Sequence, residues 1–153
     1  MNILLLEDKA ARLYELQKVL ENHGYRIYLC SDVYEAKSTF KKYEENIDYL
    51  IIDLAMDPEG LIKEEYIKAS EKGYFTGWIW VKEYVIKKDR KFIEKTIIFS
   101  AFADMLEELK QNEMTNEFKN ICIISKNDAD WKIKIFNKLG NIQNQNGEKP
   151  NSN

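Results

Sequence analysis

Five side chains that could carry metal or phosphoryl chemistry each follow a short apolar run of the sequence. Glu7 and Asp8 follow the first run, Asp53 the third, Ser100 the fourth and Lys126 the fifth. Three carboxylates crowded together repel one another, and their pKa values rise unless a cation shares the site. Mg2+ accepts a few carboxylate oxygens plus water and can also hold a phosphoryl oxygen. If the fold gathers these residues, they predict a divalent cation site, to which Lys126 adds a fixed positive charge and Ser100 a hydroxyl donor.

The apolar runs themselves have the character of buried parallel strands. Several are almost continuously apolar, whereas an antiparallel strand with one solvated face would alternate. The second run is more mixed in composition and suits a sheet edge. We therefore predict five strands, at Ile3–Leu6, Tyr25–Cys30, Tyr49–Ile52, Thr96–Phe99 and Ile121–Ile124.

Segments with helical spacing separate these runs. Apolar residues recur every three or four positions in the segments that begin near residues 13, 33, 102 and 131. His23-Gly24 can end the first of these helices, and Ser31 or Asp32 can cap the second. The aromatic stretch 74–86 also fits a helix, although Ile79, Val81 and Tyr84 leave a strand open.

Alternating strands and helices predict an α/β fold with right-handed crossovers. We expect a flavodoxin-like, doubly wound sandwich, in which a five-stranded parallel sheet of order 2-1-3-4-5 has helices on both faces. In this order ligands bind at the carboxyl ends of strands 1 and 3. The same order places Cys30 and Cys122 on opposite edges, too far apart for a disulfide.

Composition and charge limit the class of protein. The chain has 153 residues, of which 44% are hydrophobic and 32% charged, and this predicts one globular domain over 1–140. The segment 141–153, rich in Asn and Gln, is predicted to be a disordered tail. A net charge of -3 with intermixed Lys and Glu argues against direct nucleic-acid binding. The first residues lack a basic segment and a long apolar run, so we expect no membrane span and a cytoplasmic location.

The order of these five candidate site residues along the chain resembles that in receiver domains of two-component response regulators. The shared features are an acidic pair after strand 1, a lone Asp after strand 3, Ser with a small neighbour after strand 4, and Lys after strand 5. The resemblance extends from about Asn2 to Leu139. It implies a stand-alone receiver that signals through contact with a downstream protein and is not an enzyme acting on a separate substrate. Association into a homodimer is left open.

The resemblance also implies a role for each site residue. Asp53 would accept a phosphoryl group from a sensor histidine kinase or a phosphotransfer protein. Mg2+ would be bound by Asp8, by Asp53 and by the backbone carbonyl of Ala55, and by Glu7 through water.

Two further side chains would act on the phosphoryl group. Lys126 would pair with Asp53 before the transfer and with phosphoryl oxygens after it, and Ser100 would donate a hydrogen bond to one of these oxygens. Positioning and charge stabilisation would then supply most of the catalysis.

Three departures from the family pattern leave an alternative open. Asn127 stands where receivers usually have a Pro in a cis bond, so the Lys126–Asn127 bond is expected to be either trans or strained. Ile123 replaces the aromatic residue that moves on activation. The connection from Asp53 to Ser100 has about 15 extra residues, predicted between 57 and 73, which would form a lid, a partner surface or a tolerated insertion. The alternative is a pseudo-receiver, a protein-interaction module that works without phosphorylation.

Two enzyme classes are disfavoured. Haloacid-dehalogenase-type phosphatases need a second Asp two residues after the nucleophile, where this chain has Ala55. Flavin and dinucleotide sites need glycine in the turn after strand 1, and the turn here is Glu7-Asp8-Lys9-Ala10.

Overall fold

A computed structural model describes residues 1–112 and 119–140; the segments 113–118 and 141–153, the second of which is the predicted tail, lie outside the described residues. The described residues contain one five-stranded parallel sheet of order β2-β1-β3-β4-β5, which confirms the predicted topology. The strands are β1 (Asn2–Leu6), β2 (Arg26–Cys30), β3 (Tyr49–Ile52), β4 (Thr96–Ser100) and β5 (Cys122–Ser125).

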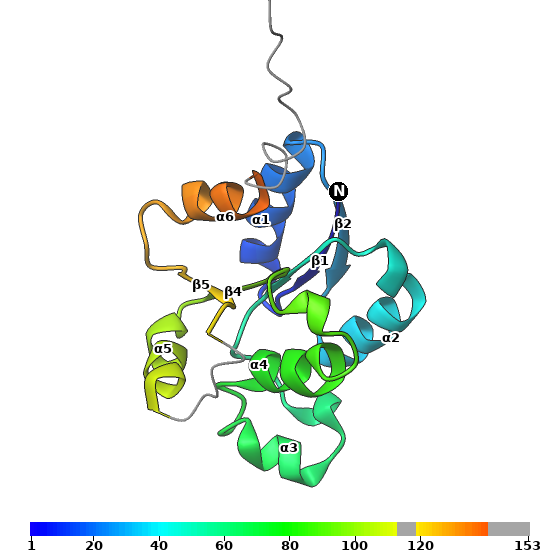
Figure 1. Ribbon diagram of the computed structural model, residues 1–153, viewed down its shortest axis with the longest axis vertical. Helices are drawn as coiled ribbons and strands as arrows, with labels where there is room; N and C mark the ends of the chain where they lie inside the picture. Colours follow the sequence, from blue (N-terminus) through cyan, green and yellow to red (C-terminus); the bar gives the residue numbers. More distant parts are fainter. Residues whose placement is uncertain (113–118, 141–153) are drawn as a thin grey trace, which may run out of the picture.

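Helices cover both faces of this sheet, as expected of a doubly wound fold (Figure 1). On one face lie α1 (Ala10–Asn22) and α6 (Trp131–Gly140), and on the other lie α2 (Val33–Tyr43), α4 (Thr76–Trp80) and α5 (Ala103–Asn112). Successive strand residues point to opposite faces, so Leu4 and Leu6 join one hydrophobic core and Ile3 and Leu5 join the other.

Local signals set the helix ends. The Asp32 side chain accepts a hydrogen bond from the Glu35 amide at 2.8 Å, and the Glu35 carboxylate accepts one from the Ser31 amide at 2.8 Å. This reciprocal arrangement satisfies the Glu35 amide, which the first turn of α2 cannot pair, and the Ser31 amide just before the helix. Gly24, at φ 81°, turns the chain after α1 into β2. Both features confirm the predicted boundaries.

The connection from β3 to β4 contains several short helical segments and no strand among its described residues. It contains a 3-10 turn at Glu59–Leu61, helix α3 (Glu64–Ala69), helix α4 with a π-helical continuation at Val81–Ile86, and a 3-10 turn at Arg90–Phe92. The strand considered for 74–86 is therefore wrong. The helical spacing prevails because it buries Phe75, Trp78, Ile79, Val85 and Ile86 in one core.

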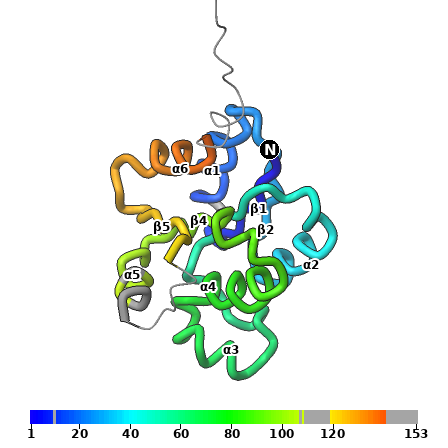
Figure 2. The backbone as a smooth tube through the Cα atoms, in the orientation of Figure 1, coloured from blue at the N-terminus to red at the C-terminus, as the bar shows by residue number. Residues whose placement is uncertain are grey.

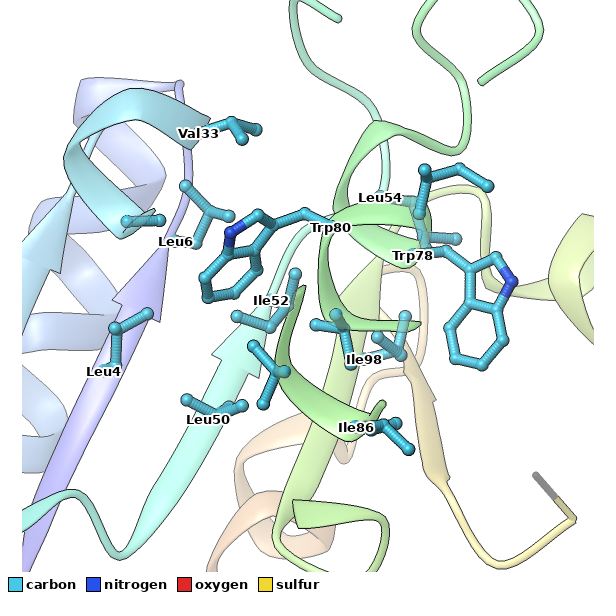
Figure 3. Close-up of a cluster of buried hydrophobic side chains, with 14 of the residues drawn as sticks. Leu4, Leu6, Val33, Leu50, Ile52, Leu54, Trp78, Trp80, Ile86 and Ile98 are labelled. Atoms are coloured by element: carbon cyan, nitrogen blue, oxygen red, sulfur yellow. The ribbon is translucent and has the colours of Figure 1, made fainter. Parts of the chain in front are cut away.

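Both tryptophans of this segment are core residues. Trp78 and Trp80 are 6% and 1% exposed, and Figure 3 shows Trp80 beside Leu6 and Ile52 of the sheet and Val33 of α2. The Trp80 ring also meets Phe40 edge to face, with centroids 6.2 Å apart.

The segment 57–73, where extra residues are predicted, is held by hydrogen bonds to neighbouring elements. The Tyr84 hydroxyl donates to the Leu61 carbonyl at 2.6 Å, and the Tyr34 hydroxyl of α2 donates to the Glu59 carbonyl at 3.2 Å. Figure 2 follows this segment through α3, at the end of the molecule remote from the start of β1. Among the described residues, no helix is long and apolar enough to cross a membrane.

Candidate functional site

The three acidic residues meet at the carboxyl ends of two adjacent strands. Leu6 pairs with Ile52 in the β1–β3 ladder, and the Asp53 amide continues it by donating to the Leu6 carbonyl at 2.9 Å. The residues that follow, Glu7, Asp8 and Asp53, therefore offer carboxylate oxygens that all lie within 4.8 Å of one another. Glu7 and Asp53 are buried, and Asp8 is exposed.

Lys126 lies between the two buried carboxylates. Its ammonium Nζ contacts the Glu7 carboxylate and donates to Asp53 Oδ2 at 2.7 Å, and its side chain is only 5% exposed. The residue is placed by the sheet, because the Lys126 amide donates to the Ser100 carbonyl at 3.0 Å just after β4 and β5 pair.

The charges at this site do not balance. Burial raises the pKa of the Glu7 carboxyl, and although Lys126 lowers it, the negative charge of nearby Asp53 acts in the same direction as burial. With Glu7, Asp8 and Asp53 ionised, three negative charges face the single positive charge of Lys126. A divalent cation would neutralise the remaining two, so the donor set fits a hard ion such as Mg2+.

A backbone carbonyl, that of Ala55, is also predicted to join this donor set. In the loop after Asp53, the carbonyls of Leu54 and Met56 accept hydrogen bonds from Gly77 and Thr76. No described residue donates to the carbonyl of Ala55, which lies between them in the chain. Within the described part of the chain, this oxygen therefore has no competing hydrogen-bond donor.

Ser100 and its neighbours lie at the same carboxyl-terminal end of the sheet as the three acidic residues. Ser100 is fully buried at the end of β4, and its hydroxyl accepts from the Phe102 amide at 3.2 Å. The Lys126–Asn127 peptide bond is trans, and Asn127 donates from its side chain to the Ala101 carbonyl at 3.4 Å. Asn127 thus links the loops that follow β4 and β5 without the cis bond.

The sequence did not predict that residues at the start of α4 contact the loop after Asp53. Thr76 and Gly77 contact the loop that follows Asp53, yet they lie more than 20 residues further along the chain and belong to no motif. A glycine inside an otherwise helical aromatic run was the available signal, because such a glycine often marks a close approach of two backbone segments.

The pocket beside Lys126 is small. It has a volume of about 120 Å³ and is lined by Arg12, Glu15, Leu16, Phe99, Lys126 and Trp131. Pockets for small organic ligands usually measure about 300 to 1,000 Å³. This part of the surface suits a small group better than a metabolite.

Comparison with solved structures shows the same fold in receiver domains. The non-phosphorylated HemR receiver domain from Leptospira biflexa matches with a TM-score of 0.64 at 18% identity, over 99% of this chain and 98% of that one. TrrA from Thermotoga maritima, solved with Mg2+ and BeF, matches with a TM-score of 0.58 at 20% identity, over 90% and 98%. CheY from Borrelia burgdorferi, solved with CheX, BeF3 and Mg2+, matches with a TM-score of 0.63 at 16% identity, over 94% of this chain and 89% of that one.

By sequence alone, no protein-family model and no curated protein matches the chain. The structural likeness establishes that the chain has the receiver fold. The predicted order of strands and the resemblance drawn from five residues agree with it.

Proposed function

We propose that the chain, with residues 1–140 as its receiver domain, accepts a phosphoryl group on Asp53 in the presence of Mg2+. The observation that supports this most directly is the position of the Asp53 carboxylate, hydrogen-bonded to Lys126 and within 4.8 Å of Glu7 and Asp8. The donor would be the phosphohistidine of a sensor histidine kinase or phosphotransfer protein. TrrA, a neighbour in fold, was solved with Mg2+ and a beryllium fluoride group.

In the proposed transfer, a carboxylate oxygen of Asp53 attacks phosphorus, the bond from phosphorus to the histidine nitrogen breaks, and an acyl phosphate forms. Mg2+ would be held by Asp8, Asp53 and the Ala55 carbonyl, and by Glu7 through water, and would supply charge neutralisation. Lys126 already donates to Asp53 Oδ2, so its ammonium is in place to follow the new phosphoryl oxygens.

Ser100 would stabilise the product. Its oxygen accepts from the Phe102 amide, which leaves the hydroxyl proton for a phosphoryl oxygen. We propose an output through contact with another protein in the cytoplasm rather than through catalysis on a separate substrate. The Borrelia neighbour, solved in complex with CheX, supports this kind of output.

Phosphorylation is tested by incubating the protein with acetyl phosphate and Mg2+ and measuring its intact mass. The wild type should gain one phosphoryl group, and Asp53→Asn should gain none. Asp57→Asn is the matched control, because Asp57 is an exposed acid in the same loop. A modification that survives in Asp53→Asn, or a wild type whose mass never changes, would refute the proposal.

The pseudo-receiver remains the second candidate because of Asn127 and Ile123. Ile123 is half-buried on β5, so no aromatic residue is available there to move when Ser100 does. This candidate predicts an unmodified protein whose partner binds Asp53→Asn as tightly as the wild type.

A further inference from the structure

The start of α4 contacts the backbone of the loop that carries Asp53. The Thr76 hydroxyl donates to the Met56 carbonyl at 2.8 Å, and the Gly77 amide donates to the Leu54 carbonyl at 2.9 Å. Both Thr76 and Gly77 are buried. These two bonds fix the Leu54–Ala55 and Met56–Asp57 peptide groups, which flank the peptide group that carries the Ala55 carbonyl.

The approach at Gly77 is closer than any side chain allows. A Cβ atom placed there would lie 1.8 Å from the Asp53 carbonyl oxygen and 2.9 Å from both its carbon and Ile52 Cγ2. Since real atoms do not approach so closely, only glycine permits this contact. The backbone of α4 therefore rests directly on the peptide group of the phosphate-accepting residue.

A second close approach lies just before the helix. Gly73, at φ 97°, accepts from the Met56 amide at 3.1 Å, and a Cβ there would lie 2.7 Å from the Met56 carbonyl oxygen. The Asp53 loop is thus fixed at both ends of its turn by the segment that precedes and begins α4.

Apolar packing does not account for these contacts. The apolar residues of this segment, such as Trp78 and Ile79, already bury themselves in the core. Thr76 adds a polar group to a fully buried position, which is costly unless the group is hydrogen-bonded, and its partner is a loop carbonyl.

We infer that Thr76 and Gly77 are positioning residues for the cation site. By occupying the carbonyls of Leu54 and Met56, they hold the loop so that the carbonyl of Ala55 is the one left for Mg2+. This rests on the proposed function, and it assigns part of the site to a segment with no counterpart among the five residues that predicted it.

The first test measures Mg2+ affinity by calorimetry and stability by urea unfolding. Thr76→Val keeps the shape and loses the donor, so Mg2+ should bind about 10-fold more weakly, as for other groups that orient metal ligands. Thr76→Ser should restore the affinity. The control is Thr96→Val, which removes another fully buried hydroxyl, one that donates to the Phe92 carbonyl at 2.6 Å and not to the Asp53 loop.

A second measurement uses the wild type alone and so does not depend on a variant folding. Positioning and cation binding must affect each other equally, so Mg2+ should slow hydrogen exchange at the Gly77 amide more than at the Ser70 amide.

Three results are decisive. Wild-type affinity in Thr76→Val, with stability reduced as in Thr96→Val, would reduce Thr76 to a structural role. Equal effects of Mg2+ on the two amides would overturn the inference as well. A wild type that binds no Mg2+ would instead refute the proposed function, and the inference with it.

Discussion

Replacing Lys126 by Met tests whether the site is held together by its charges. The substitution removes the ammonium that contacts Glu7 and donates to Asp53 Oδ2 at 2.7 Å, and it leaves a side chain of similar length. All three groups are about 5% exposed or less. Removing one partner of a buried pair costs about 3 to 5 kcal/mol, because the other charge stays buried and unpaired. We expect Lys126→Met to lower the free energy of unfolding by that amount without metal.

Mg2+ should recover part of this loss relative to the wild type. The variant leaves three carboxylates with no cation, so Mg2+ replaces the missing positive charge. A ligand at 100 times its dissociation constant stabilises a protein by about 2.7 kcal/mol. Because the variant site is more negative, its dissociation constant should fall about tenfold, which adds about 1.4 kcal/mol relative to the wild type.

The assay is urea unfolding followed by the fluorescence of the buried Trp78 and Trp80, with EDTA or with excess Mg2+. Lys132→Met is the matched control. Lys132 pairs with Glu15 at 3.0 Å, but both side chains are about half exposed, so its loss should change stability by no more than about 0.5 kcal/mol. The reasoning fails if Lys126→Met costs less than about 1 kcal/mol, or if Mg2+ stabilises it no more than the wild type.

Two further predictions concern the rest of the fold. Burial disfavours the ionised form of Glu83, but hydrogen bonds from Lys87, Tyr66 and Lys82 outweigh it and hold the pKa of Glu83 below 4.5. The contribution of ionised Glu83 to folding stability is then present above pH 4.5 and is lost as the pH falls through the folded-state pKa. Glu83→Gln should therefore lower the free energy of unfolding by about 1 to 2 kcal/mol at pH 7. Urea unfolding should show this difference from the wild type shrinking below pH 4.5. Burial raises the pKa of the Cys30 thiol to about 12, so a thiol reagent at pH 8 should label half-buried Cys122 well before Cys30, and comparable native rates would contradict the burial of Cys30 in the core.

The sheet and the residues that follow its strands were predictable because they depend on short stretches of sequence. Continuous apolar runs such as Tyr49–Ile52 specify strands buried on both faces, and a parallel order brings their carboxyl ends together whatever the loops contain. Asp32 and Gly24 marked helix ends through their own side chain and backbone preferences. The relation of Asp53 to Glu7 and Asp8 follows from strand order alone.

The segment 74–86 was ambiguous because its aromatic and β-branched residues favour strands while their spacing favours a helix. The structure resolves the conflict through burial, since Trp80 in a helix fills the space between Leu6, Ile52 and Val33 (Figure 3). The predicted stripe near residue 102 was partly wrong, because Met105 is 38% exposed while Leu106 is buried. Both positions fit the same spacing, and only the neighbouring elements decide which one faces the core.

The loop after Asp53 shows why the geometry of a candidate site can be predicted only in part from its residue types. Strand ends fix where Asp53 lies, but the direction of a loop carbonyl depends on which groups occupy its neighbours. Here those groups are Thr76 and Gly77, supplied by a helix that must first bury Trp78 and Trp80. The packing of that helix would therefore be coupled to the geometry of the proposed cation site. A substitution that shifts α4, even one far from any carboxylate, should change the affinity for Mg2+ as well as stability.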